Sequence, residues 1–279
     1  MLLNRALKWQ CRLSGRHTAL IMVAAMLRVG LATVAAQDMM RHIDLTSAEM
    51  TSAEMTRADV EARIAAATFS QRADFTGKKL SGLDLSGLDL SGVILRAAKL
   101  NKTKLSDAKL DGAILDQAWL LEADLSRASL KGANIFAAQM QRSRLDGADL
   151  SGARVVADLT GASLVGAVLM HANLAADMKN QSMGLIRTVL KSANLERAIL
   201  RDADLSRVDL EFASLKDADL TNASLRGAAL GGATLIGVTI VGTDFLEADL
   251  TSTKLIRPIG LEVARNFDRA RNTDRLLRE

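Results

Sequence analysis

The chain has 279 residues and a formal net charge of +4, and only 3% of its residues are aromatic, with no Tyr. This length allows one large domain or two small ones, and a core with so few rings must be narrow and uniform. Cys11 is the only cysteine, which excludes a disulfide framework or a cysteine-rich metal site within one chain.

The excess of positive charge lies in residues 1–42, while Lys and Arg balance Asp and Glu over residues 71–256. A nucleic-acid-binding surface needs a concentrated basic patch. The main body of the chain has none, so we do not expect it to bind nucleic acid.

Residues 1–36 have the pattern of a secretory signal peptide. A basic leader precedes an apolar run, and the small residues Val34 and Ala36 stand just before Gln37. Arg28 interrupts the apolar stretch and argues against a membrane-spanning helix, because an Arg at mid-membrane costs about 2.5–3.5 kcal/mol. We expect export to the periplasm after cleavage at Ala36. The alternative is a mis-assigned start codon and a cytoplasmic protein.

Residues 37–70 are expected to form a linker and a capping helix. Thr56 and Asp59 have the spacing of a helix N-terminal signal. Apolar residues at helical spacing follow within residues 55–67, namely Ala58, Val60, Ile64 and Ala67. We expect this helix to cover the start of the domain that comes next.

From residue 71 to residue 256, apolar residues recur at every fifth position, as at Leu85, Leu90 and Leu95. Neither a helix nor a strand has this period. The residue two places before each Leu is mostly Ala, and the one between them is often Asp or Asn. The other two positions favour Ser, Asp, Gly, Lys and Arg, which are typical of turns. Each five-residue unit therefore consists of a three-residue strand and a two-residue corner.

Corners that all bend the same way must coil the chain. Successive coils stack about 4.8 Å apart, so that each short strand pairs with the coil above or below it. This is a β-solenoid, in which a single unit is unstable alone. Leu and Ala fill its axis and leave no room for a substrate pocket, so only the outer faces are available for recognition.

Residues 193–230, "ANLERAILRDADLSRVDLEFASLKDADLTNASLRGAAL", resemble the pentapeptide repeat family, whose pattern is A(D/N)LXX. The resemblance covers about residues 71–256. It implies a right-handed quadrilateral parallel β-helix with four units in each coil, and therefore about nine coils. Members of the family that protect gyrase from quinolone drugs share this fold.

The repeat breaks twice. One residue is missing between Leu150 and Leu159, and the frame is lost over residues 175–184 before it resumes at Leu185. Irregular segments of a solenoid project from the coil and often carry function. The candidate partner-binding loop consists of Asp177, Met178, Lys179, Asn180, Gln181 and Met183. The alternative is a neutral bulge.

Two sets of outward apolar residues are further candidates. The first is a partner patch of Ile94, Ile114 and Trp119. The second lies in the last coils and consists of Ile236, Val241, Leu246 and Ile256. This second set could contact a tail that folds back over the end of the solenoid, or a second copy in a homodimer formed through that end. The tail itself, residues 257–279, is expected to be polar and helical, with few apolar contacts.

No catalytic or metal-binding constellation stands out. His171 occupies an outward corner, and Asp204, Asp209 and Asp219 follow the repeat as residues of a solvated face. We therefore expect no catalytic residue, no cofactor, no metal and no small-molecule substrate. The prediction is a non-enzymatic scaffold that presents flat faces and one irregular loop to an unknown protein partner.

A topoisomerase-protecting DNA mimic of the quinolone-resistance type is the alternative function. Such a mimic needs a strongly negative surface. This chain instead places cations at outward strand positions, namely Lys99, Lys104, Lys109, Arg144 and Arg154.

Overall fold

The computed structural model describes residues 44–68, 71–178 and 186–278. The expected signal peptide lies outside these residues, as do Leu185 and four residues of the predicted loop, Lys179, Asn180, Gln181 and Met183. Residues 44–279 form one compact unit. Within the described ranges, no helix combines the length and the apolar character needed to cross a bilayer.

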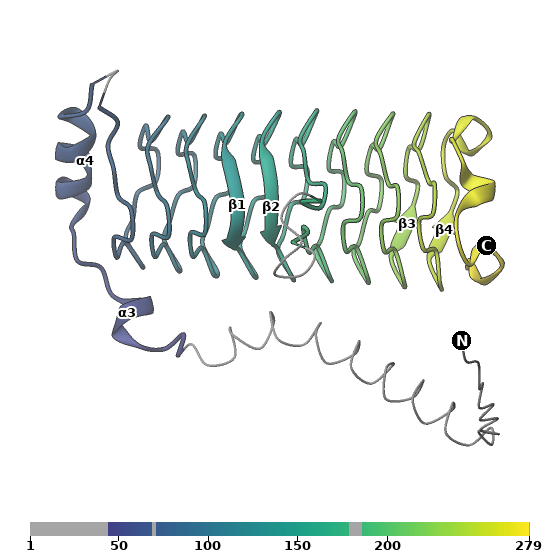
Figure 1. Cartoon of the computed structure of the whole chain (residues 1–279), viewed down its shortest axis with the longest axis horizontal. Coiled ribbons are helices and arrows are strands. Elements are labelled where there is room, and N and C mark those ends of the chain that lie inside the picture. Colours follow the sequence, from purple (N-terminus) through teal and green to yellow (C-terminus); the bar gives the residue numbers. More distant parts are fainter. Residues whose placement is uncertain (1–43, 69–70, 179–185, 279) are drawn as a thin grey trace, which may run out of the picture. The chain divides into compact units, whose positions relative to one another are not determined.

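The chain winds into stacked coils (Figure 1). Each coil adds one short strand to each of four faces. A residue on one face pairs in parallel with the residue twenty positions further along, as Lys104 does with Asp124. The chain is therefore a β-solenoid, as its sequence predicts. The right-handed winding that the resemblance implies stays a prediction.

The four faces are defined by the outward residues at the middle of each strand. Face A holds Asp74, Ile94, Ile114, Asn134, Arg154, Asn173, Asp204, Ser224, Asp244 and Arg265. Face B holds Lys79, Lys99, Trp119, Gln139, Asp158, Val189, Asp209, Ala229, Asp249 and Arg271. Face C holds Asp84, Lys104, Asp124, Arg144, Ser163, Asn194, Ser214, Thr234, Lys254 and Leu277. Face D holds Asp89, Lys109, Ser129, Asp149, Val168, Ile199, Asp219, Thr239 and Ile259.

Some strands extend beyond a single bridge. The extended strands within the described residues are β1 (Asn134–Gln139), β2 (Arg154–Asp158), β3 (Thr234–Ile236) and β4 (Lys254–Ile256). β1 pairs with β2, and β3 pairs with β4, both in parallel. Elsewhere the strands are too short for this, because a corner follows every third residue.

The unit of residues 125–129 shows how each backbone N–H is used. Two of its N–H groups donate to the next coil, and one donates to the previous coil. The N–H of Ala128 closes the corner on the carbonyl oxygen of Leu125 at 3.0 Å. The remaining N–H, that of Ser126, donates to Oδ1 of Asp124 at 3.0 Å. An Asp or Asn at the middle of the strand therefore accepts a hydrogen bond from the one N–H of the next unit that has no backbone acceptor. This explains why Asp and Asn recur at that position of the repeat.

The same side-chain bond recurs along the solenoid, at Asp84, Asp89, Asp149, Asp204, Asp219 and Asp249. The second residue of the corner has a positive φ, both where it is glycine, as in Gly152 at 65°, and where it is not, as in Arg127 at 57°. A residue with a Cβ loses roughly 1–2 kcal/mol in this conformation. The frequent Gly at this position follows from that cost.

Leu and Ala fill the axis as expected. Leu120 and Ala118, for example, are both fully buried. A buried Thr replaces the Ala in some units, and its hydroxyl then donates to a carbonyl of the preceding coil. The hydroxyl of Thr243 does so to Leu220 at 2.7 Å. The axis therefore admits a polar atom only where a backbone acceptor is within reach.

The N-terminal end of the solenoid is covered by α4 (Arg57–Ala65), while α3 (Ala48–Thr51) lies beside the first two coils, where Glu49 pairs with Lys79 and Lys99. Thr56 and Asp59 form a reciprocal capping box at the start of α4, and Val60 on this helix is fully buried. Ala58 was expected in the apolar stripe, but it is exposed. Its position, two residues before Val60, places it away from the buried face of the helix.

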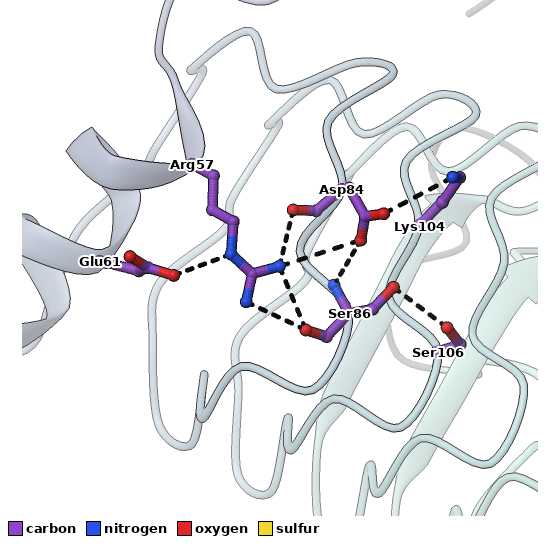
Figure 2. A network of polar contacts seen from close by, with 6 residues as sticks. All are labelled: Arg57, Glu61, Asp84, Ser86, Lys104 and Ser106. Carbon is purple, nitrogen blue, oxygen red and sulfur yellow. Dashed lines mark hydrogen bonds and ion pairs between the residues drawn. The ribbon is translucent and has the colours of Figure 1, made fainter.

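Arginine side chains of α4 bind carbonyl groups at the open edge of the first coil. Arg57 donates from Nη1 to the carbonyl oxygens of Asp84 at 3.0 Å and Ser86 at 3.2 Å, as Figure 2 shows. Arg63 donates to the carbonyl oxygen of Asp74 at 3.1 Å. No earlier coil exists to serve these acceptors, so the cap protects an edge that could otherwise pair with another chain.

The C-terminal tail corrects the expectation of a polar helical segment. It forms one more coil, in which six-residue units replace the units of five. Ile259, Arg265, Arg271 and Leu277 pair with the preceding coil at this spacing. Between them lie three 3₁₀ helices, η3 (Leu261–Val263), η4 (Phe267–Arg269) and η5 (Thr273–Arg275).

Each 3₁₀ helix follows a residue with left-handed backbone, namely Gly260, Asn266 and Asn272. Leu261, Phe267 and Leu276 pack against the core, and the ring of Phe267 meets that of Phe245 edge to face at 5.2 Å. The tail therefore makes substantial apolar contact and closes the end of the axis. The five-residue pattern does not extend into the tail, because the period of the tail is six residues, as in "IGLEVA RNFDRA RNTDRL".

Candidate functional site

The coils are irregular at one corner, between face A and face B. Gln139 pairs with Asp158, nineteen residues on, and Asp158 then pairs with Val189, thirty-one residues on. The missing residue and the inserted loop therefore fall at the same corner of successive coils. β1 and β2 run across this corner side by side, with a shift of register between Phe136 and Gln139.

Thr188 holds the base of the inserted loop. In a regular unit, the N–H three residues after the inward Leu closes the corner on its carbonyl group. After Leu174 the equivalent N–H, that of Asp177, donates instead to Ile186 at 2.8 Å. The buried hydroxyl of Thr188 lies 2.7 Å from the carbonyl oxygen of Leu174 and 2.5 Å from that of Val155. The one proton of this hydroxyl is shared between the two carbonyl groups, so Thr188 serves Leu174 in place of the missing corner bond and also serves Val155.

Phe136, Arg154 and Asp177 stack across three coils beside the loop. The guanidinium carbon of Arg154 lies 4.4 Å from the centre of the Phe136 ring, within the range of a cation–π contact. Nη2 of Arg154 lies 3.4 Å from Oδ2 of Asp177. The Asp177 side chain is nearly buried, so this ion pair is shielded from solvent on one side.

The candidates predicted as separate sites lie around this same corner. Ile94 and Ile114 stack on face A, and Trp119 is the outward residue of face B in the same coil as Ile114. Phe136 occupies the corner between the two faces one coil later, and Met178 is exposed at the root of the loop. We call Ile94, Ile114, Trp119, Phe136 and Met178 the A/B edge surface.

The sequence prediction missed Phe136 as a site residue and treated Arg154 only as an outward cation. One signal could have found Phe136: it is an aromatic residue at the first corner position, where other units carry mainly polar residues. Its contact with Arg154 depends on stacking between coils of different length, which the repeat pattern does not contain.

The four apolar candidates of the last coils lie at three different corners. Ile236 and Ile256 stack in register at the corner between faces C and D. Val241 lies at the next corner, between faces D and A, and Leu246 lies beyond face A. The tail covers the end of the axis. The role of these four residues as contacts of the tail or of a second copy stays a prediction.

The repeated carboxylates serve the backbone. Hydrogen bonds from the side chain and the N–H of Ser86 lower the pKa of Asp84, and those of Ser91 lower the pKa of Asp89. His171 is exposed at a corner with φ of 57°. In the described part of the chain, no three His, Cys, Asp or Glu side chains converge as a metal site would require.

These coils of five-residue units, four to a turn, define a class of protein, the solenoids built from short tandem repeats. The family model "Pentapeptide repeats" matches the sequence in eight copies, within residues 71–107, 79–117, 103–136, 120–152 and 185–222. The chain belongs to the pentapeptide repeat family. No curated protein matches the sequence.

Solved structures also resemble the chain. HetL, a pentapeptide repeat protein involved in heterocyst differentiation regulation from the cyanobacterium Nostoc sp. strain PCC 7120, shares 26% identity with a TM-score of 0.38, over 78% of this chain and 92% of that one. QnrB1, a plasmid-mediated fluoroquinolone resistance protein, shares 17% identity with a TM-score of 0.31, over 68% and 87% of the two chains. A protein of the Arabidopsis thaliana thylakoid lumen shares 27% identity with a TM-score of 0.28, over 45% and 66%.

Proposed function

We propose that this pentapeptide repeat protein is a non-enzymatic scaffold that binds a protein partner through the A/B edge surface. The supporting observation is a set of half-exposed apolar side chains on faces A and B, beside the corner at which the coil length changes in the following coils, together with the exposed Met178 at the root of the loop. Regular corners of the solenoid carry mainly polar residues and Gly. Apolar groups set together on a rigid surface are typical of protein interfaces, where aromatic side chains often dominate the binding energy.

The solenoid gives this surface a fixed shape. Ile94 and Ile114 lie on paired backbone, and Phe136 is held under Arg154. A preorganised surface loses little conformational freedom when a partner binds, which favours affinity. Asp177, which precedes Met178 at the root of the loop, adjoins this surface and adds a polar group for specificity.

Affinity capture with the full chain, tagged after Glu279, tests this function. The variant Trp119→Ala/Phe136→Ala is compared with Phe212→Ala, which removes an exposed aromatic residue from a different corner. We expect a partner that the native chain and Phe212→Ala retain and that the double variant loses, with all three chains equally folded by circular dichroism. Identical captured proteins from all three chains would contradict the proposed surface.

The charge pattern does not favour a DNA mimic. Lys104 lies 3.5 Å from Asp84, and Lys109 lies 3.9 Å from Asp89, so cations of the second coil neutralise carboxylates of the first. A mimic should leave rows of carboxylates unneutralised. We expect no protection of gyrase from a quinolone in a supercoiling assay, and protection at micromolar protein would reverse this assignment.

We propose further that the protein is exported, with cleavage after Ala36. The supporting observation is the order of basic leader, apolar run and small residues in the first 36 residues. N-terminal sequencing of protein from the periplasmic fraction should begin at Gln37. An intact N-terminus on protein recovered from the cytoplasm would contradict export.

A further inference from the structure

Exposed apolar side chains also gather in the last coils, on and beside face D. Ile259 is 58% exposed, Val263 is 52% exposed and Val241 is 37% exposed. Ile236 and Ile256 add a stacked, half-exposed pair at the neighbouring corner. We call Ile236, Val241, Ile256, Ile259 and Val263 the face D surface.

The backbone keeps these side chains close together. Ile259 pairs with Thr239 on face D itself, and Val241 follows Thr239 by two residues. Gly260 packs tightly against Val241, since a Cβ on Gly260 would clash with the side chain of Val241. This glycine, with φ of 83°, also starts the turn that exposes Val263. The face D surface is therefore continuous from one corner to the other.

Opposite charges flank this surface on its two sides. Arg257 is exposed at the corner between faces C and D, and Glu262 is exposed in η3 at the corner between faces D and A. Among the described residues, neither forms an ion pair. Two unpaired opposite charges at the two edges of one apolar face make that face complementary to itself.

We infer that the face D surface joins two copies of this chain side by side, about a two-fold axis parallel to the axis of the coils. This axis places the C/D corner of one copy against the D/A corner of the other, so that Arg257 of each copy meets Glu262 of its partner. An axis across the coils would instead place Arg257 against Arg257. The charges therefore select the parallel arrangement, while the apolar side chains supply most of the affinity.

This arrangement differs from a dimer joined end to end. The tail closes the C-terminal end of the axis, and Leu261, Phe267 and Leu276 are already packed against the core. The face D surface lies on the side of the solenoid. The A/B edge surface lies on other faces and stays accessible in the dimer, so the proposed function and this inference can fail independently.

Sedimentation velocity on the full chain measures the association. The native chain should form a species of about twice 29.8 kDa at roughly 100 μM. Ile259→Asp places a charge at the centre of the interface on a side chain already exposed in the monomer, and should raise the dissociation constant about tenfold or more. Phe212→Asp, at an exposed aromatic residue on another corner, is the matched control and should leave the association unchanged.

Charge reversal tests the parallel arrangement. Arg257→Glu and Glu262→Arg should each weaken the dimer by about two- to fivefold, and the double variant should restore it. Monomeric native chain at this concentration, or Ile259→Asp associating like the native chain, overturns the inference. Loss without restoration in the double variant overturns the parallel geometry. Equal thermal unfolding of all variants shows that the fold itself is unchanged.

Discussion

Residues 89–129 and the irregular corner between residues 134 and 189 use the same repeat, yet they satisfy their backbone differently. In the regular coils, the ladder, the corner turn and an Asp side chain accept the N–H groups of a unit. At the irregular corner, Asp177 donates across the loop root, and Thr188 serves the carbonyl group of Leu174 from a distance in sequence. Where the number of residues in a coil changes, backbone groups therefore form hydrogen bonds with groups distant in sequence instead of groups within their own five-residue unit.

The irregular corner also differs on its surface. Regular corners carry mainly Ser, Asp, Lys, Arg and Gly, which water solvates. The A/B corner carries Phe136 and a loop root, with an ion pair between Arg154 and Asp177. A solenoid thus keeps its axis uniform and varies its recognition surface by changing the length of a corner.

The largest expected effect is the loss of folding stability when an inward Leu is truncated, and it should be the same in both regions. Leu120→Ala in a regular coil and Leu174→Ala in the irregular coil each remove a fully buried side chain from the axis. Each should lower the free energy of unfolding by about 2–5 kcal/mol, because the neighbouring coils cannot collapse into the cavity. Urea unfolding followed by circular dichroism measures both. A much smaller loss for Leu174→Ala would show that the irregular coil has a loose interior.

The next effect should separate the two regions. Thr188→Val keeps the shape of the side chain but removes the hydroxyl that serves the carbonyl groups of Leu174 and Val155, and should cost about 1–3 kcal/mol. Thr243→Val is the matched control. Its acceptor, Leu220, also receives the N–H of Ala223 at 2.8 Å and so keeps a partner. Equal losses from the two variants would contradict a special role for Thr188.

A smaller effect is expected at a regular corner. Gly152→Ala should destabilise the protein by about 1 kcal/mol, because φ of 65° is unfavourable for Ala although no atom crowds its Cβ. Gly232→Ala should cost more, because the new Cβ would lie 2.6 Å from the ring of Phe212. Thermal unfolding compares the two. The reverse order would show that crowding at this corner is relieved by movement of Phe212.

The smallest expected effect is on the loss of folding stability at acidic pH. The folded protein holds the pKa of Asp89 below its ordinary value, through the side chain and N–H of Ser91. A lowered pKa stabilises the fold above the unfolded value of about 3.9, and this contribution is lost as pH falls through the folded pKa. Asp89→Asn should keep an acceptor for the N–H and lose less stability than the native chain between pH 6 and about pH 3.

Asn173 at the irregular corner already shows the neutral form of this bond, since its Oδ1 accepts the N–H of Ala175 at 3.0 Å. Urea unfolding at the two pH values measures the difference between native and variant. An identical acid loss in both would assign the acid sensitivity to other carboxylates.

Much of the fold follows from the chain's period. Leu85, Leu90 and Leu95 are all buried, as a five-residue unit of strand and corner requires. The tail was not predictable in this way, because a six-residue period with Asn266 and Asn272 in left-handed conformation resembles a polar helix until its register with the last coil is known. Of the candidate site, Ile94 and Ile114 could be placed together from their spacing of twenty, whereas their nearness to Phe136 and the loop could not.

By itself, the sequence determined the unit, its inward Leu and Ala, and the Asp that completes each corner, because these depend on interactions within five residues or on a constant spacing. Only the tertiary structure decided which faces the irregular residues occupy. A single missing residue leaves the local order of inward and outward side chains unchanged, but it changes which side chains of neighbouring coils lie opposite one another. Contacts such as that of Arg154 with Phe136 and Asp177 arise from this stacking and therefore exist only in the folded coil.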